Sequence, residues 1–145
     1  MSFFKSMDIS GSGMTAQRLR MDIIAQNVAN VNTTRGANGQ PYRRQETVLQ
    51  PINQNSFSQY LSDGIEKIEG KGVKVSAIIE DQSPFKLEYD PTNADAGADG
   101  YVKLPNIDMA NELVDMISAS RAYEANVTVI NAFKNLATKA MEIGK

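Results

Sequence analysis

The apolar residues near the start of the chain follow the spacing of one helix face. They recur at steps of three, four and seven: Met14, Met21, Ile24, Val28 and Val31. This spacing predicts a helix over residues 14–31 with a single apolar stripe. Gly11 and Gly13 each cost roughly 1 kcal/mol in a helix relative to alanine, so we expect the turns before about Ser12 to fray.

A second and longer helical pattern covers the C-terminal part of the chain. Its stripe alternates steps of four and three: Met109, Leu113, Met116, Ser120, Tyr123, Val127, Ile130, Lys134, Ala137 and Met141. This repeat predicts a coiled-coil seam on a helix roughly 50 Å long. We expect Asn106 or Asp108 to cap the helix after Pro105, and Gly144 to end it.

The middle of the chain alternates apolar and polar residues with the period of two that is typical of half-buried strands. The alternating stretches are residues 48–49, 73–79 and 85–89, and a further extended segment precedes Pro105. Turns rich in glycine, proline and asparagine separate them at 35–41, 63–64, 70–72 and 90–100. We therefore expect short strands joined by turns.

Together these patterns predict a mainly α fold, in which long N- and C-terminal helices pair as a coiled coil and a small β and loop region lies between them in the sequence. The expected parts are an N-terminal helix in 1–34, the middle region in 35–104 and the C-terminal helix in 105–145. The stripes contain Met, Ala, Ser and Asn more than Leu and Ile, so a lone two-helix pair buries little apolar surface and is marginal. Spacing alone leaves two interpretations open, an intramolecular helical hairpin and a subunit whose stripes are covered by other copies.

Composition excludes many kinds of chemistry. The chain has no cysteine and no histidine, which removes thiolate nucleophiles, imidazole bases and the usual zinc ligands. A formal net charge of −2 provides no basic field for nucleic acid. We expect no enzyme activity, no cofactor, no nucleic-acid partner and no small-molecule substrate.

The remaining charged clusters have simple explanations. Asp90, Asp95 and Asp99 lack the acidic spacing and the final bidentate Glu of a calcium-binding EF-hand loop, so we expect no metal site. Three arginines, at positions 35, 43 and 44, stand in an acidic chain and are expected on a solvated strand face or a protein interface. Glu46, Asp63 and Glu66 show no spacing that pairs a general acid with a base.

Two segments resemble a known family. The first helix closes with QNVANVNTT, which resembles the ANxxT signature of flagellar axial proteins at Ala29, Asn30 and Thr33. The C-terminal run beginning YDPTNADAGADGYVKLP and including RAYEAN is similar to the same family. Both ends in this order within 145 residues resemble the proximal-rod subunits of the bacterial flagellar basal body. The resemblance covers roughly two thirds of the chain and is weakest over residues 53–70.

The resemblance implies a structural protein that polymerises through its terminal helices into the helical drive-shaft tube of the rod. It implies export through the flagellar type III apparatus without a cleaved signal peptide, which agrees with the polar residues that interrupt MSFFKSMDISGSG, and a place in the periplasmic rod. The implied partners are other copies of the chain, other rod subunits, the adaptor that joins the rod to the membrane ring, the export apparatus and the rod cap. The two helix stripes would form the helix and subunit interfaces. The alternative is a soluble intracellular helical-hairpin adaptor or regulator that binds a partner helix.

Overall fold

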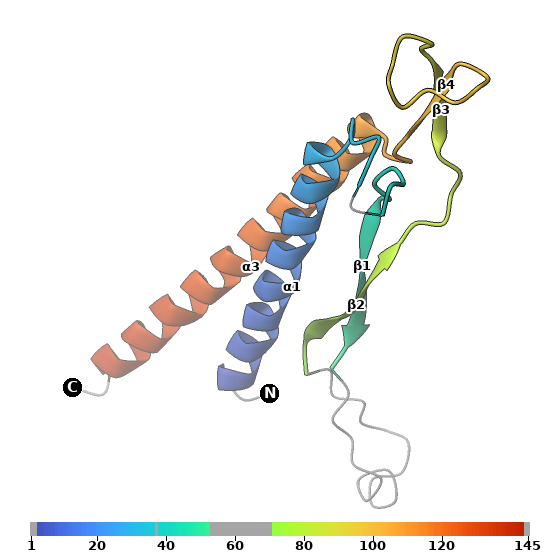
Figure 1. Cartoon of the computed structure of the whole chain (residues 1–145). Helices are drawn as coiled ribbons and strands as arrows, with labels where there is room; N and C mark the ends of the chain where they lie inside the picture. Colours follow the sequence, from blue (N-terminus) through green and yellow to red (C-terminus); the bar gives the residue numbers. More distant parts are fainter. Residues whose placement is uncertain (1–2, 37, 53–70, 144–145) are drawn as a thin grey trace, which may run out of the picture.

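Two long helices dominate the computed structural model, which describes residues 3–36, 38–52 and 71–143 (Figure 1). They are α1, Phe3–Ala29, and α3, Met109–Ile143. The helices run antiparallel, and both chain ends lie at the same end of the pair. The prediction of terminal helices around a small β region is confirmed, while coiled-coil geometry of the pair stays a prediction.

Helix α1 begins at Phe3 and so includes the glycine-containing turns before Ser12. That these turns fray in the isolated chain stays a prediction. Ser12 helps to hold this part of the helix, because its Oγ accepts a hydrogen bond of 3.1 Å from the backbone N–H of Val73. The helix ends at Ala29, before the predicted Val31, and a turn follows in which the N–H of Asn30 donates to the carbonyl of Gln26.

The start of α3 agrees with the sequence pattern. Asp108 caps the helix, since its Oδ1 accepts a hydrogen bond of 2.9 Å from the N–H of Ala110. Pro105 is buried just before this cap. The predicted stop at Gly144 lies outside the described residues.

The middle region forms two separate antiparallel hairpins. Strands β1, Gln45–Pro51, and β2, Val73–Glu80, pair with a register shift between Val48 and Leu49. Strands β3, Lys86–Tyr89, and β4, Tyr101–Leu104, form the second pair. The first hairpin lies along α1, and the second lies beyond the end of the helix pair where α3 begins (Figure 1). The predicted turn at 63–64 and residue 70 lie outside the described residues.

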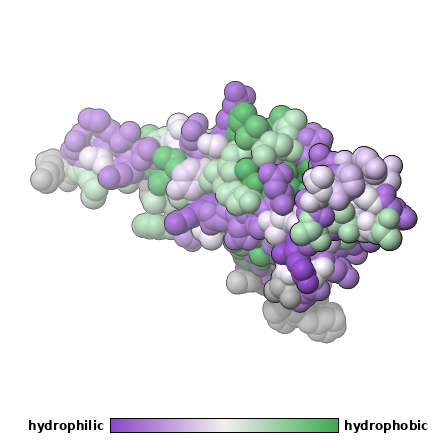
Figure 2. All heavy atoms as spheres, turned by 45° about the horizontal axis from the view of Figure 1, so that its top comes forward, coloured by the Kyte–Doolittle hydropathy of each residue, from purple (hydrophilic) through white to green (hydrophobic). Residues whose placement is uncertain are grey.

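The apolar core is small. Its buried members are Ala16, Ile23, Ile24, Val102, Ile107 and Ala119. Many larger apolar side chains are exposed, and Figure 2 shows apolar residues gathered over the middle of the elongated molecule. Neither described helix has the combined length and apolar character that a membrane span requires.

Candidate functional site

Small and polar residues form part of the contact between α1 and α3. A Cβ added at Gly13 would lie 3.1 Å from the side-chain amide atoms of Asn126, so the glycine lets α3 approach closely. Ala119 is buried, and Asn27 meets Glu112 further along the pair. Such a contact fixes how the helices sit, but it buries little apolar surface.

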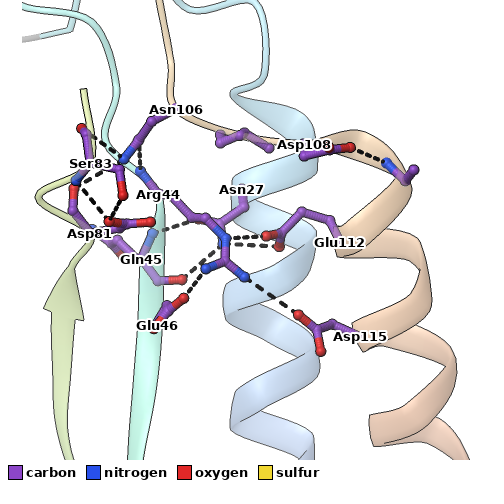
Figure 3. Close-up of polar contacts among 12 residues, drawn as sticks. Asn27, Arg44, Gln45, Glu46, Asp81, Ser83, Asn106, Asp108, Glu112 and Asp115 are labelled. Atoms are coloured by element: carbon purple, nitrogen blue, oxygen red, sulfur yellow. Dashed lines mark hydrogen bonds and ion pairs between the residues drawn. The ribbon is translucent and has the colours of Figure 1, made fainter. Parts of the chain in front are cut away.

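Asn27 is the centre of a polar cluster that joins α1, α3 and the first hairpin (Figure 3). Its side chain is 0% exposed. Its amide nitrogen donates to the carbonyl of Gln45 at 2.9 Å and to Oε2 of Glu112 at 3.1 Å. Its amide oxygen accepts from the N–H of Gln45 at 2.9 Å and from the hydroxyl of Tyr42 at 3.1 Å. The Asn27 side chain therefore bonds to both the backbone N–H and the backbone carbonyl of Gln45, as a residue of a neighbouring strand would.

Arg44 supplies the positive charge of this cluster. Its guanidinium contacts Glu112, Asp115 and Glu46, and its backbone N–H donates to Oδ1 of Asn106 at 2.9 Å. Glu112 is 0% exposed, and a buried carboxylate without such partners would be strongly destabilising. The cluster therefore holds the first hairpin, the start of α3 and the end of α1 in one arrangement.

The surroundings of Tyr42 shift the pKa of its hydroxyl. Burial raises the pKa of its hydroxyl above the ordinary value of 10.0, and the nearby carboxylates of Glu112 and Glu80 raise that pKa further. The neutral phenol is thus the form that the fold favours. Glu112 was not singled out from the sequence as a contact residue, because its partners Asn27 and Arg44 lie 85 and 68 residues away along the chain.

Three α3 residues that lie toward α1 are not members of the predicted stripe. Glu112, Ala119 and Asn126 lie toward α1, one position before the predicted Leu113, Ser120 and Val127. Leu113 itself is 52% exposed. The three residues that lie toward α1 are seven positions apart, and they are polar or small where an apolar row was expected.

The predicted residues Leu113, Ser120 and Val127 lie on the side of the helix pair away from the first hairpin, together with part of the α1 stripe. Ser12 faces the first hairpin, because it bonds to β2. Two residues correspond to a rotation of about 200° around the helix axis, so Met14 points away from the hairpin. Likewise, Asp115 faces the first hairpin, because it contacts Arg44 beside β1. Leu113 lies two residues before Asp115 and therefore points away from the hairpin. We call this side the far face; its residues are Met14, Met21 and Val28 from α1 and Leu113, Ser120 and Val127 from α3.

The other predicted interface residues occupy varied positions. Ile24 is buried, and Val31 is partly exposed in the turn after α1. The partly exposed members of the α3 stripe are Met116, Tyr123 and Ile130. Met109 and Met141 are exposed, at 39% and 69%. Whether these residues meet other subunits stays a prediction.

The three motif positions form the end of α1. Asn30 donates from its Nδ2 to the carbonyl of Gln26 at 2.8 Å, and its Oδ1 accepts from the hydroxyl of Thr33 at 3.2 Å. The N–H of Thr33 also donates to the carbonyl of Asn30 at 3.0 Å. Asn30 and Thr33 therefore close the helix, whereas Ala29 is exposed and makes no such bond in the described part of the chain.

The charged candidates from the sequence stabilise turns and packing. Asp90 accepts two hydrogen bonds from Thr92, which lower the pKa of its carboxyl below 3.8, and Asp95 accepts from Thr34 at 2.8 Å. Arg43 lies 4.4 Å over the ring of Phe85. Among the described residues, the acidic side chains form no group of three that could hold a metal ion.

A cleft of about 290 Å³ lies between α1, α3 and β1. Its charged residues are already paired, since Arg20 contacts Asp115 at 3.0 Å and Arg44 contacts Glu112. The polar groups of the cleft thus hold the elements together.

Comparison with known proteins shows the family. A family model described as flagella basal body rod protein matches residues 7–37, and one described as flagellar basal body rod FlgEFG protein C-terminal matches residues 98–143. The chain is 50% identical to the flagellar basal-body rod protein FlgC of Bacillus subtilis, with both chains covered in full. The chain belongs to the FlgC family. It is also 46% identical to FlgC of Borreliella burgdorferi, over 99% of this chain and 98% of the relative, and 38% identical to FlgC of Salmonella typhimurium over the full length of both.

The two family matches fall on the two helical ends of this FlgC-family chain. The first covers most of α1 together with the Asn30–Thr33 turn, and the second covers β4 and α3. The resemblance inferred from the ANxxT-type motif is thereby confirmed.

Proposed function

We propose that this chain is a structural subunit of the proximal rod of the bacterial flagellar basal body, which polymerises through α1 and α3. Full-length identity with FlgC proteins supports the rod assignment. Nothing in these comparisons favours the alternative of a soluble adaptor.

The observation that carries the polymerisation proposal is the uncovered apolar surface of the helix pair. Over its 35 residues, α3 packs against no described helix or strand other than α1. A long helix with this much exposed apolar surface is stabilised mainly by packing against partners. The far face supplies such a surface, because it combines methionine and aliphatic side chains from both helices.

The first hairpin then lies on the other side of the helix layer and the second lies beyond its end, where both are available to set spacing or partner identity. Other rod subunits, the adaptor to the membrane ring, the export apparatus and the rod cap are the proposed partners. Repeated contacts that do not close on themselves give an open helical polymer, which is the form that a rod requires.

A charge on the far face tests the proposal. Met21→Asp and Val127→Asp each place a carboxylate where a neighbouring helix should pack, so we expect rods not to form while the chain is still secreted. Rod formation is measured by swimming and by electron microscopy of isolated basal bodies. Gln26→Asp provides the matched control, because this exposed α1 residue lies off the far face. Normal motility of both far-face variants would refute the proposal.

A further inference from the structure

The outer sides of α1 and α3 carry rows of exposed residues. Gly13 faces α3, so Gly11, two residues earlier, faces away from α3, and a Cβ added there would meet nothing within 4 Å. Arg18, Asp22, Ala25 and Ala29 continue this outer line at steps of seven, four, three and four, and all four are exposed.

The outer line of α3 is found by the same rule. Glu112, Ala119 and Asn126 lie toward α1, so residues two positions away from them point outward. They are Val114, Ile117, Arg121 and Glu124. Val114 is 66% exposed and Ile117 is 54% exposed, which makes the first turns of this line apolar.

We propose that the outer line of α1 in one copy of the chain packs antiparallel against the outer line of α3 in a second copy. The inference deepens the proposed function, on which it rests, by naming one contact between neighbouring copies. The two lines point in opposite directions within one chain, so they meet only between copies.

The two lines match in spacing and in charge. Counted back from Ala29, the α1 line has members at 0, 4, 7 and 11 residues; counted forward from Val114, the α3 line has members at 0, 3, 7 and 10. One antiparallel alignment therefore places alanine against Val114 and Ile117. The same alignment places Asp22 against Arg121 and Arg18 against Glu124.

The order of the charges selects this direction of packing. A parallel alignment would place Arg18 against Arg121 and Asp22 against Glu124, and like charges at a contact are repulsive. None of these four side chains forms an ion pair within the described part of the chain, so each is available to a neighbour. The alignment also brings Gly11 level with Ala132, where two small residues allow close approach.

Charge reversal in the full chain tests the pairing. Asp22→Arg and Arg121→Asp should each raise the concentration of purified chain needed for self-association about fivefold, because an attraction becomes a repulsion. The double variant restores opposite charges and should return to within about twofold of the original value. Sedimentation velocity measures association, and circular dichroism checks folding. Glu88→Arg on β3 is the control with the same charge change as Asp22→Arg. A double variant no better than the single ones would overturn the proposal.

Cross-linking tests the geometry inside cells. The chain has no cysteine, so Ala25→Cys combined with Ile117→Cys introduces the only two thiols. Because these sites point in opposite directions, oxidation should link copies into a ladder of dimers and longer products, whereas Ala25→Cys alone gives none. Swimming cells that yield no ladder would overturn this contact and leave the proposed function intact; motile Met21→Asp and Val127→Asp cells would contradict the proposed function itself.

Discussion

Replacing Asn27 by alanine should destabilise the chain more than any other substitution at the end of α1. The change removes four hydrogen bonds from a side chain that is 0% exposed. Three of them join neutral groups and contribute about 1 kcal/mol each, and the bond to the Glu112 carboxylate contributes about 1.5 to 3 kcal/mol.

The full sum exceeds the expected effect, because water can enter the space that the amide leaves and satisfy part of the cluster. We expect a loss of about 3 to 4 kcal/mol in the free energy of unfolding. This is a large fraction of the roughly 5 to 15 kcal/mol that stabilises a typical domain.

Urea unfolding followed by circular dichroism measures this loss. Asn30→Ala is the matched control, since Asn30 is also an asparagine at the end of α1 but bonds only locally, to Gln26 and Thr33. Its loss should be about 1 kcal/mol. Equal losses for the two variants, or a loss below about 1 kcal/mol for Asn27→Ala, would refute the view that Asn27 joins the hairpin to the helices.

Three further predictions concern Tyr42, Gly11 and Gly13. Absorbance near 295 nm should show a tyrosine titration step above the ordinary pKa of 10.0, and Tyr42→Phe should remove that step. Because the folded pKa of Tyr42 is raised, its stabilising contribution is present below about pH 10 and is lost as the pH rises through the folded pKa. Gly11→Ala should raise the free energy of unfolding of the isolated chain by about 0.5 to 1 kcal/mol, since nothing opposes the new methyl group. Gly13→Ala should be about 1 kcal/mol less stable than Gly11→Ala, because its methyl group displaces the Asn126 amide; equal thermal midpoints would contradict the close approach of α3 there.

Periodicity predicted the helices and strands well because it reflects local geometry. The helical spacing at the two ends corresponds to α1 and α3, and the stretch at 73–79 corresponds to β2, of which only the first residues alternate in burial. Local propensity says less about the start of α1, because its glycine-containing turns are held by tertiary contacts of Ser12 and Gly13 that lie far apart from their partners in the sequence.

The α3 residues that lie toward α1 could not be predicted from periodicity. A search for apolar stripes selects Leu113 and Val127, whereas the contact uses Glu112 and Asn126. Glu112 is acceptable inside only because Asn27 and Arg44 arrive from distant parts of the sequence. Polar contacts of this kind depend on the tertiary fold and leave no periodic signal in the sequence.

The distribution of side chains in the helix pair bears on how such a chain can assemble. Polar groups inside the pair give up favourable contacts with water and yield little net stability, but they allow only one arrangement that satisfies all of them. The apolar side chains, which yield most of the free energy of burial, are left largely on the outside. The polar contacts therefore set the geometry of the subunit within one chain, while the exposed apolar side chains leave surface for contacts between chains. The proposed polymerisation would bury this surface and so couple the folding of the subunit to its incorporation.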